Sequence, residues 1–224
     1  MKATKIMTKA AILLLGGIMA TSCTDLDEEL YGRLTPDNYY QNEAQALSSL
    51  AGCYEYMAYM SRAGGDSWRI GEYGTDELFC PGRSNGGWYD EYVNQIMEHK
   101  CTPDNDRLNV CWNTYIFPGI GADNAVLAAM EGSAVKDRLP GPIAEVRALR
   151  AYEYFYAMDY FGNVPLFTDP RPDANNMPKT TPRAEVFKFI ETELLAAAED
   201  LPSAKDVDAS YYPRLTKEAA YTLL

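Results

Sequence analysis

The side chains best suited to hold a ligand lie in a glycine-rich segment, residues 61–98. Four of them are close together: Arg83, Asn85, Trp88 and Tyr89. Flat Trp and Tyr rings can contact the apolar C–H face of a sugar ring, while Arg and Asn side chains can hydrogen-bond its hydroxyl groups. This combination is typical of a glycan-binding surface, and loops often carry such functions. A second interpretation stays open for Trp88, in which its ring anchors the segment to the core.

Trp68 lies in the same segment and is a further candidate for ligand contact. Its neighbour Ile70 favours a second interpretation, in which the Trp68 ring is buried. A loop as long as this one is usually functional or disordered, and its six aromatic residues argue against disorder. We therefore expect an ordered loop that carries binding residues.

Catalytic and metal-binding patterns are weak in this sequence. Two pairs of adjacent carboxylates, Asp76-Glu77 and Asp90-Glu91, have the chemistry for general acid–base work, but nothing places two of them across a glycosidic bond. The single histidine, His99, has no cluster of further metal ligands around it. We expect no catalytic residue, no metal and no cofactor. A secreted glycan hydrolase that uses two of these carboxylates is an alternative.

The charge of the chain excludes two kinds of partner. Lys and Arg number 20 and Asp and Glu number 32, which gives a formal net charge of −12. Nucleic-acid binding relies on clustered basic residues, and so does electrostatic docking onto an anionic membrane. We therefore expect no nucleic-acid partner, and membrane attachment that is covalent or mediated by a protein.

The first 22 residues have the order of a secretory signal. A basic start with three lysines precedes an apolar run at 10–19, which is too short to span a membrane. Ala20, Thr21 and Ser22 follow, and then Cys23. This order resembles the lipobox of bacterial lipoproteins, with Ala20 where leucine is usual, and it predicts acylation of Cys23. Simple secretion is the alternative. The acidic residues after Cys23 predict a solvated tether over 23–34.

Four further cysteines are widely spaced and form no CxxC pair: Cys53, Cys80, Cys101 and Cys111. A structural zinc site is therefore not expected. An oxidising compartment permits disulfides, but a chain of this size has no need of them, and most of these thiols are expected to be buried.

The sequence predicts five helical stretches, beginning near Asn42, Asn109, Pro142, Pro182 and Thr216. The last three starts (142, 182 and 217) are 40 and 35 residues apart, close to the roughly 34-residue period of tetratricopeptide repeats. Pro118 is expected to kink or split the second stretch, and only residues 164–167 look extended. We expect a mainly all-α, tetratricopeptide-like helical repeat scaffold with long inserted loops. The last helix is still uncapped at Leu224, so we expect this region, 35–224, to be incomplete at its C-terminus.

Two helices carry more specific expectations. Asn42 is placed to cap the first one, with Gln45 three residues on, and Gly52 beside the apolar stripe suggests close approach of another helix. In the third helix, Arg147 and Arg150 are three residues apart. They suggest either an anion site or ion pairs along the helix, and we favour the ion pairs.

Four segments together resemble the SusD/RagB family of outer-membrane nutrient-binding lipoproteins. They are LTPDNYYQNEAQALSSLAGCYEYM (34–57), YGTDELF (73–79), CWNTYIFPGIGADNAVL (111–127) and AEVRALRAYEYFYAMDYFGNVPLFTDP (144–170). The last is similar to the family's most recognisable helix and the turn after it. Cys23 stands where the family has its lipid anchor.

The resemblance implies a function. Such proteins lie as lids on a SusC-like, TonB-dependent transporter at the cell surface, bind glycan or in some cases peptide for nutrient uptake, and are not enzymes. Family members are considerably longer than this chain, which corresponds to their N-terminal part. A peptide-binding lipoprotein and a scaffold whose partner is another protein are the alternatives.

Overall fold

The computed structural model describes residues 40–224, except 41, 85–86, 174 and 176–177. The chain divides into two compact units, Met1–Leu34 and Thr35–Leu224, and all the described residues belong to the second. The predicted signal (1–22), the predicted tether (23–34) with Cys23, and Asn85 therefore lie outside the described residues.

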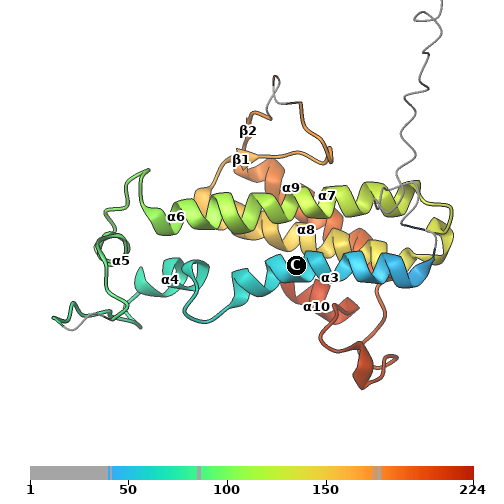
Figure 1. The fold of residues 1–224 in the computed structure, drawn as a ribbon, viewed down its shortest axis with the longest axis horizontal. Helices are drawn as coiled ribbons and strands as arrows, with labels where there is room; N and C mark the ends of the chain where they lie inside the picture. The colour runs from blue at the N-terminus through green and yellow to red at the C-terminus, as the bar shows by residue number, and fades with distance from the viewer. Residues whose placement is uncertain (1–39, 41, 85–86, 174, 176–177) are drawn as a thin grey trace, which may run out of the picture. The chain divides into compact units, whose positions relative to one another are not determined.

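Helices dominate the described part of the chain. Its four longest are α3 (Glu43–Ser61), α7 (Phe117–Gly132), α8 (Pro140–Phe161) and α9 (Arg183–Asp200). α8 packs against α3, α7 and α9, and α10 (Lys217–Leu223) packs against α9 (Figure 1). Two 3-10 turns, Lys136–Arg138 and Ala209–Tyr211, lie in the connections. The helical class predicted from the sequence is confirmed.

The glycine-rich segment is more regular than expected. It contains two short helices, α4 (Asp66–Tyr73) and α5 (Glu91–Met97), where the sequence predicted a long loop. Their shortness explains the error, because one or two helical turns give too few residues for a periodic pattern. Residues 74–84 and 87–90 between them keep the irregular backbone and include Trp88 and Tyr89.

Pro118 does not break the helix that contains it. Helix α6 (Asp106–Val110) continues through a π-helical turn, η2 (Cys111–Ile116), directly into α7. Proline has no N–H to donate and its ring clashes with the preceding turn. A widened π turn just before Pro118 relieves this clash, so the chain keeps its helical course.

Helix α3 confirms one expectation and corrects another. Its cap is as predicted: Asn42 Oδ1 accepts a hydrogen bond of 3.0 Å from the Gln45 N–H. Gly52, however, is exposed, with no atom near its Cβ position. The glycine that permits close approach is Gly119 on α7, where a Cβ would collide with the buried carboxyl group of Glu153 on α8.

Helix α8 ends as its sequence predicts, at Gly162, which has a positive φ of 73°. The chain then forms β1 (Val164–Pro165), which pairs antiparallel with β2 (Thr180–Thr181). Val164 lies opposite Thr181 in this two-stranded ladder. The pairing confirms the first two residues of the predicted extended segment, 164–167.

The core lies mainly along α8. The buried side chains of this helix include Val146, Leu149, Ala151, Tyr154 and Ala157. A smaller cluster beneath α4 and α5 consists of Tyr73, Cys80, Val93 and Ile96. No helix among residues 40–224 as described is long and apolar enough to cross a bilayer.

The four cysteines described by the structure are free thiols. Cys53, Cys80 and Cys111 are buried, as expected, whereas Cys101 is exposed. Burial, with a smaller contribution from the charge of Asp66, raises the pKa of the Cys111 thiol to about 12. This thiol is therefore protonated and unreactive at neutral pH.

Candidate functional site

Trp88 is held at the surface by the turn that precedes α4. Its side chain is 56% exposed. Gly64 has a φ of +75°, and a Cβ there would lie 2.5 Å from Cη2 and Cζ3 of the Trp88 ring, so only glycine suits both the backbone and the contact. The guanidinium carbon of Arg69 lies 4.9 Å from the ring centroid, a cation–π contact. The ring is thus fixed in place and still offers surface to a ligand.

Tyr89 lies next to Trp88 and is 39% exposed. Its ring packs on Gly82, where a Cβ would be 3.3 Å from Tyr89 Cε1. Arg83, also predicted as a ligand residue, is exposed in the same segment. The structure thus places three of the predicted site residues within one exposed stretch, and contact of each with a ligand stays a prediction.

Trp68 has different surroundings. Its side chain is half-buried on α4, and its ring meets Tyr73 edge to face with centroids 5.8 Å apart. It packs against the cluster beneath α4 and α5, together with Ile70. These contacts match the burial that Ile70 indicates, and Trp68 has less free surface for a ligand than Trp88.

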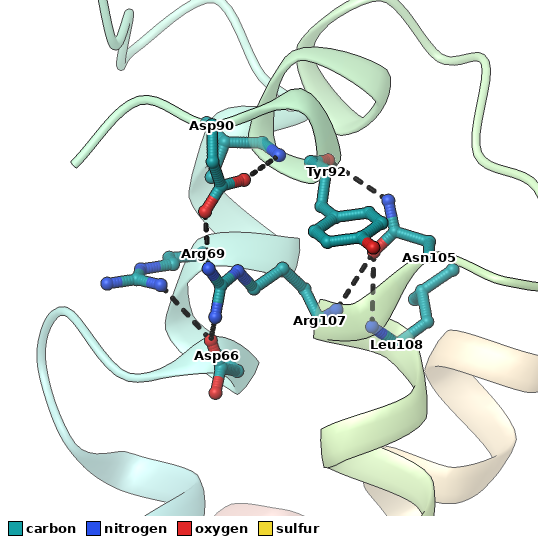
Figure 2. Close-up of polar contacts among 8 residues, drawn as sticks. Asp66, Arg69, Asp90, Tyr92, Asn105, Arg107 and Leu108 are labelled. Carbon is teal, nitrogen blue, oxygen red and sulfur yellow. Dashed lines mark hydrogen bonds and ion pairs between the residues drawn. The ribbon is translucent and has the colours of Figure 1, made fainter.

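An ion-pair network beneath this surface joins α4, α5 and α6 (Figure 2). Asp66 Oδ1 accepts from Arg69 Nη1 and from Arg107 Nη1, both at 3.2 Å. A second nitrogen of Arg107 binds Asp90, which lies two residues after Trp88. The same Arg69 contacts the Trp88 ring, so the network helps to hold this ring in place.

Asp90 acts as a structural carboxylate. Its Oδ1 caps α5 by accepting from the Val93 N–H at 2.8 Å (Figure 2). Burial alone would raise the pKa of Asp90, but the hydrogen bonds from Val93 and Arg107 outweigh it and hold this pKa below its ordinary value. A carboxylate kept ionised in this way is poorly suited to be a general acid.

Asn105 is a buried residue that the sequence analysis did not single out. Its Oδ1 caps α6 by accepting from the N–H groups of Arg107 and Leu108, at 3.1 and 3.3 Å. Its amide nitrogen donates to the Tyr92 carbonyl and to Gln95, both at 3.0 Å. Asparagine before a helix is a recognisable cap, but only the fold shows that it also ties α6 to α5.

A SusD-like family model described as "Starch-binding associating with outer membrane" matches residues 34–224. The chain belongs to the SusD-like family. The resemblance seen in the four sequence segments is confirmed.

Two relatives of known sequence are similar to this SusD-like chain. SusD-like protein P2 of Formosa agariphila is 25% identical over 82% of the chain, and a SusD-like protein of Bacteroides ovatus is 28% identical over 56% of it. The chain covers 36% of the first relative and 24% of the second. It therefore spans about a third or less of their length.

Solved structures share its fold. A SusD-like carbohydrate binding protein from Bacteroides fragilis is 27% identical, with a TM-score of 0.69 over 82% of this chain and 36% of that one. A laminarin binding SusD-like protein is 24% identical, with a TM-score of 0.70 over 82% of this chain and 39% of that one. The fold class is thus the tetratricopeptide-like helical scaffold of SusD-like proteins.

The paired arginines of this SusD-like chain are bound to another helix. Arg147 and Arg150 on α8 both contact Glu193 on α9, with Arg147 Nη2 at 2.8 Å from Oε1. Arg150 Nη1 also donates to Asn124 on α7 at 2.7 Å. The expectation of ion pairs is confirmed, but the pairs join α8 to α9, whereas pairs within one helix were expected. Both guanidinium groups already have partners, so this is no anion site.

Glu145, also on α8, joins this helix to other parts of the chain. It is fully buried, accepts from Tyr54 at 2.6 Å and from Tyr211 at 2.9 Å, and forms an ion pair with Arg214. These contacts connect α3 and the segment before α10 to α8. Glu145 thus holds these parts of the scaffold together.

Proposed function

We propose that this chain is the N-terminal part of a cell-surface lipoprotein that binds oligo- or polysaccharide and passes it to a SusC-like, TonB-dependent transporter. The observation that carries the proposal is the exposed, supported ring of Trp88 in a SusD-like chain. The family description names starch binding and the outer membrane, and the relative from Bacteroides fragilis is described as carbohydrate binding. Both support glycan as the ligand class, and the family description also supports the outer membrane as the location.

The surface has the chemistry for a sugar ring. Trp88 offers a flat apolar face to the C–H side of a pyranose, and Tyr89, the next residue, offers a second exposed aromatic ring. Arg83 and Asn85 have donors for the hydroxyl groups at the ring edge. Binding in this way needs no bond to be broken, which agrees with a protein that is not an enzyme and uses no cofactor.

A binding screen with the intact protein tests this function. We expect micromolar to millimolar affinity, about −8 to −4 kcal/mol, for at least one of starch, laminarin and their oligosaccharides, measured by calorimetry. No new reducing ends should appear during incubation. Release of reducing ends would instead support a glycan hydrolase. Repeated absence of glycan binding, with retained binding to peptide or to the transporter, would support the peptide-binding or scaffold alternative.

Lipid attachment at Cys23 is part of the proposal and has its own test. The basic start, apolar run and small residues before Cys23 support acylation of its thiol. Radiolabelled palmitate is expected to enter the wild-type protein and not the Cys23→Ala variant. Equal labelling of the two proteins would contradict the lipid anchor. Because the chain is acidic, the variant should also be lost from the membrane fraction, since no electrostatic attraction would retain it.

A further inference from the structure

A second aromatic surface lies between α3 and the π-helical turn. A groove of about 380 Å³ is lined there by Glu55, Tyr56, Tyr59, Thr114 and Tyr115. This volume lies within the range of small-molecule sites, about 300–1,000 Å³. None of the sequence patterns pointed to it, because its two sides are more than fifty residues apart in the chain.

Two stacked tyrosines form the wall of this groove. The rings of Tyr59 and Tyr115 are nearly parallel, at 13°, with centroids 5.4 Å apart. Tyr59 is 39% exposed, and its hydroxyl group donates to Glu55 Oε1 at 3.2 Å. The stacked pair thus gives a rigid flat surface with a carboxylate at its edge.

The π-helical turn explains why Thr114 and Tyr115 line the groove. Cys111 and Ile116, at the two ends of η2, are buried, while Thr114 between them is exposed and Tyr115 is half-buried. Such turns widen a helix by one residue and are frequent at functional sites. Here the turn is also the place where Pro118 is accommodated, so the same feature serves the fold and shapes the groove.

The groove has the chemistry for a neutral sugar ring. Glu55 can accept hydrogen bonds from hydroxyl groups, and Thr114 can both accept and donate. None of the groove-lining residues is basic, which disfavours an anionic ligand. Aromatic faces with acceptors at their edge match the apolar face and the polar rim of a pyranose.

One turn separates this groove from Trp88. Tyr59 lies two residues before the end of α3, and a Cβ at Gly64, in the turn that follows this helix, would touch the Trp88 ring. The two aromatic surfaces therefore flank the same turn. This adjacency suits an extended ligand that passes over both.

We propose that the groove between α3 and η2 binds a pyranose ring of the same glycan chain that stacks on Trp88. The inference rests on the proposed glycan-binding function and adds a second subsite to it. A glycan that reaches both surfaces binds more tightly than a short one, because the second ring is bound at little further cost in translational and rotational freedom.

The test compares glycans of different length on the intact protein. A disaccharide and a long oligosaccharide from the best-binding polysaccharide are titrated against wild type, Tyr59→Ala and Tyr59→Phe. Tyr59→Ala is expected to lower the affinity for the long oligosaccharide about tenfold and to leave disaccharide binding unchanged. Tyr59→Phe keeps the ring and should bind like wild type. Tyr221→Ala, which removes a tyrosine that is 56% exposed on α10, is the matched control.

A second variant blocks the groove without removing either of the stacked tyrosines. Thr114 is exposed, so Thr114→Arg fills the groove and leaves the core intact. It should keep the wild-type melting temperature while lowering long-oligosaccharide affinity to that of the disaccharide. If Trp88→Ala weakens binding but neither groove variant changes the dependence on length, the second subsite is wrong and the glycan-binding function stands. If the wild-type protein binds none of the glycans, both the second subsite and the glycan-binding function are overturned.

Discussion

Replacement of Trp88 by alanine is expected to weaken glycan binding by about 1–3 kcal/mol, the scale of stacking on an aromatic side chain. The free energy of unfolding should change much less. The ring is 56% exposed, so its removal opens no closed cavity. If the ring anchored the core, its removal would instead lower the free energy of unfolding by about 3–5 kcal/mol. Melting temperature and affinity are measured on one sample of the intact protein.

Two variants make this result specific. Phe79→Ala removes another aromatic side chain of the same segment, 74% exposed, and should leave affinity unchanged. Gly64→Ala keeps Trp88 but forces its ring away, because the new Cβ would lie 2.5 Å from two ring carbons. It should therefore reproduce part of the loss in affinity. Lost stability with unchanged affinity in the folded fraction would contradict the role of Trp88 as a sugar platform.

Local signals in the sequence were sufficient to predict the start of α3 and the end of α8. The Asn42 cap and the Gly162 terminus depend on side-chain and backbone chemistry within a few residues, and both are found as predicted. Gly52 shows the limit of such reasoning, because a glycine beside an apolar stripe does not reveal which helix lies next to it. Gly119 has the close contact instead, and its partner Glu153 is 34 residues further along the chain.

The candidate site was likewise predicted only in part. Residue type and local composition were enough to select Trp88, Tyr89 and Arg83, and all three are exposed. Their support could not be predicted, because Arg107 reaches Asp66 across 41 residues of sequence. The tyrosine groove was missed for the same reason, since Tyr59 and Tyr115 meet only when α3 packs against η2. Pairings of this kind follow from the packing of helices and leave no periodic signal in the sequence.

Replacement of Glu193 by alanine is expected to lower the free energy of unfolding by about 3–5 kcal/mol, the cost of breaking a buried ion pair. Glu193 is only 6% exposed and is the shared partner of Arg147 and Arg150. Arg150, 7% exposed, would keep Asn124 but lose its charge partner. Urea unfolding at neutral pH measures the loss. Glu191→Ala, an exposed glutamate on the same helix, is the matched control and should change stability by less than about 0.5 kcal/mol.

The pH dependence and a double variant separate the ion pair from simple loss of packing. Burial alone would raise the pKa of Glu193, but the bonds from Arg147 and Arg150 outweigh it and lower this pKa. The pair therefore stabilises the fold above the unfolded-state pKa of about 4.3, and this contribution is lost as pH falls through the lower folded-state pKa. The Glu193→Ala loss should shrink at that acidic pH. Glu193→Leu with Arg150→Met removes the two buried charges and leaves only the more exposed Arg147, so it should be more stable than Glu193→Ala alone. Equal losses at both pH values and in the double variant would show that packing, and not charge, makes Glu193 important.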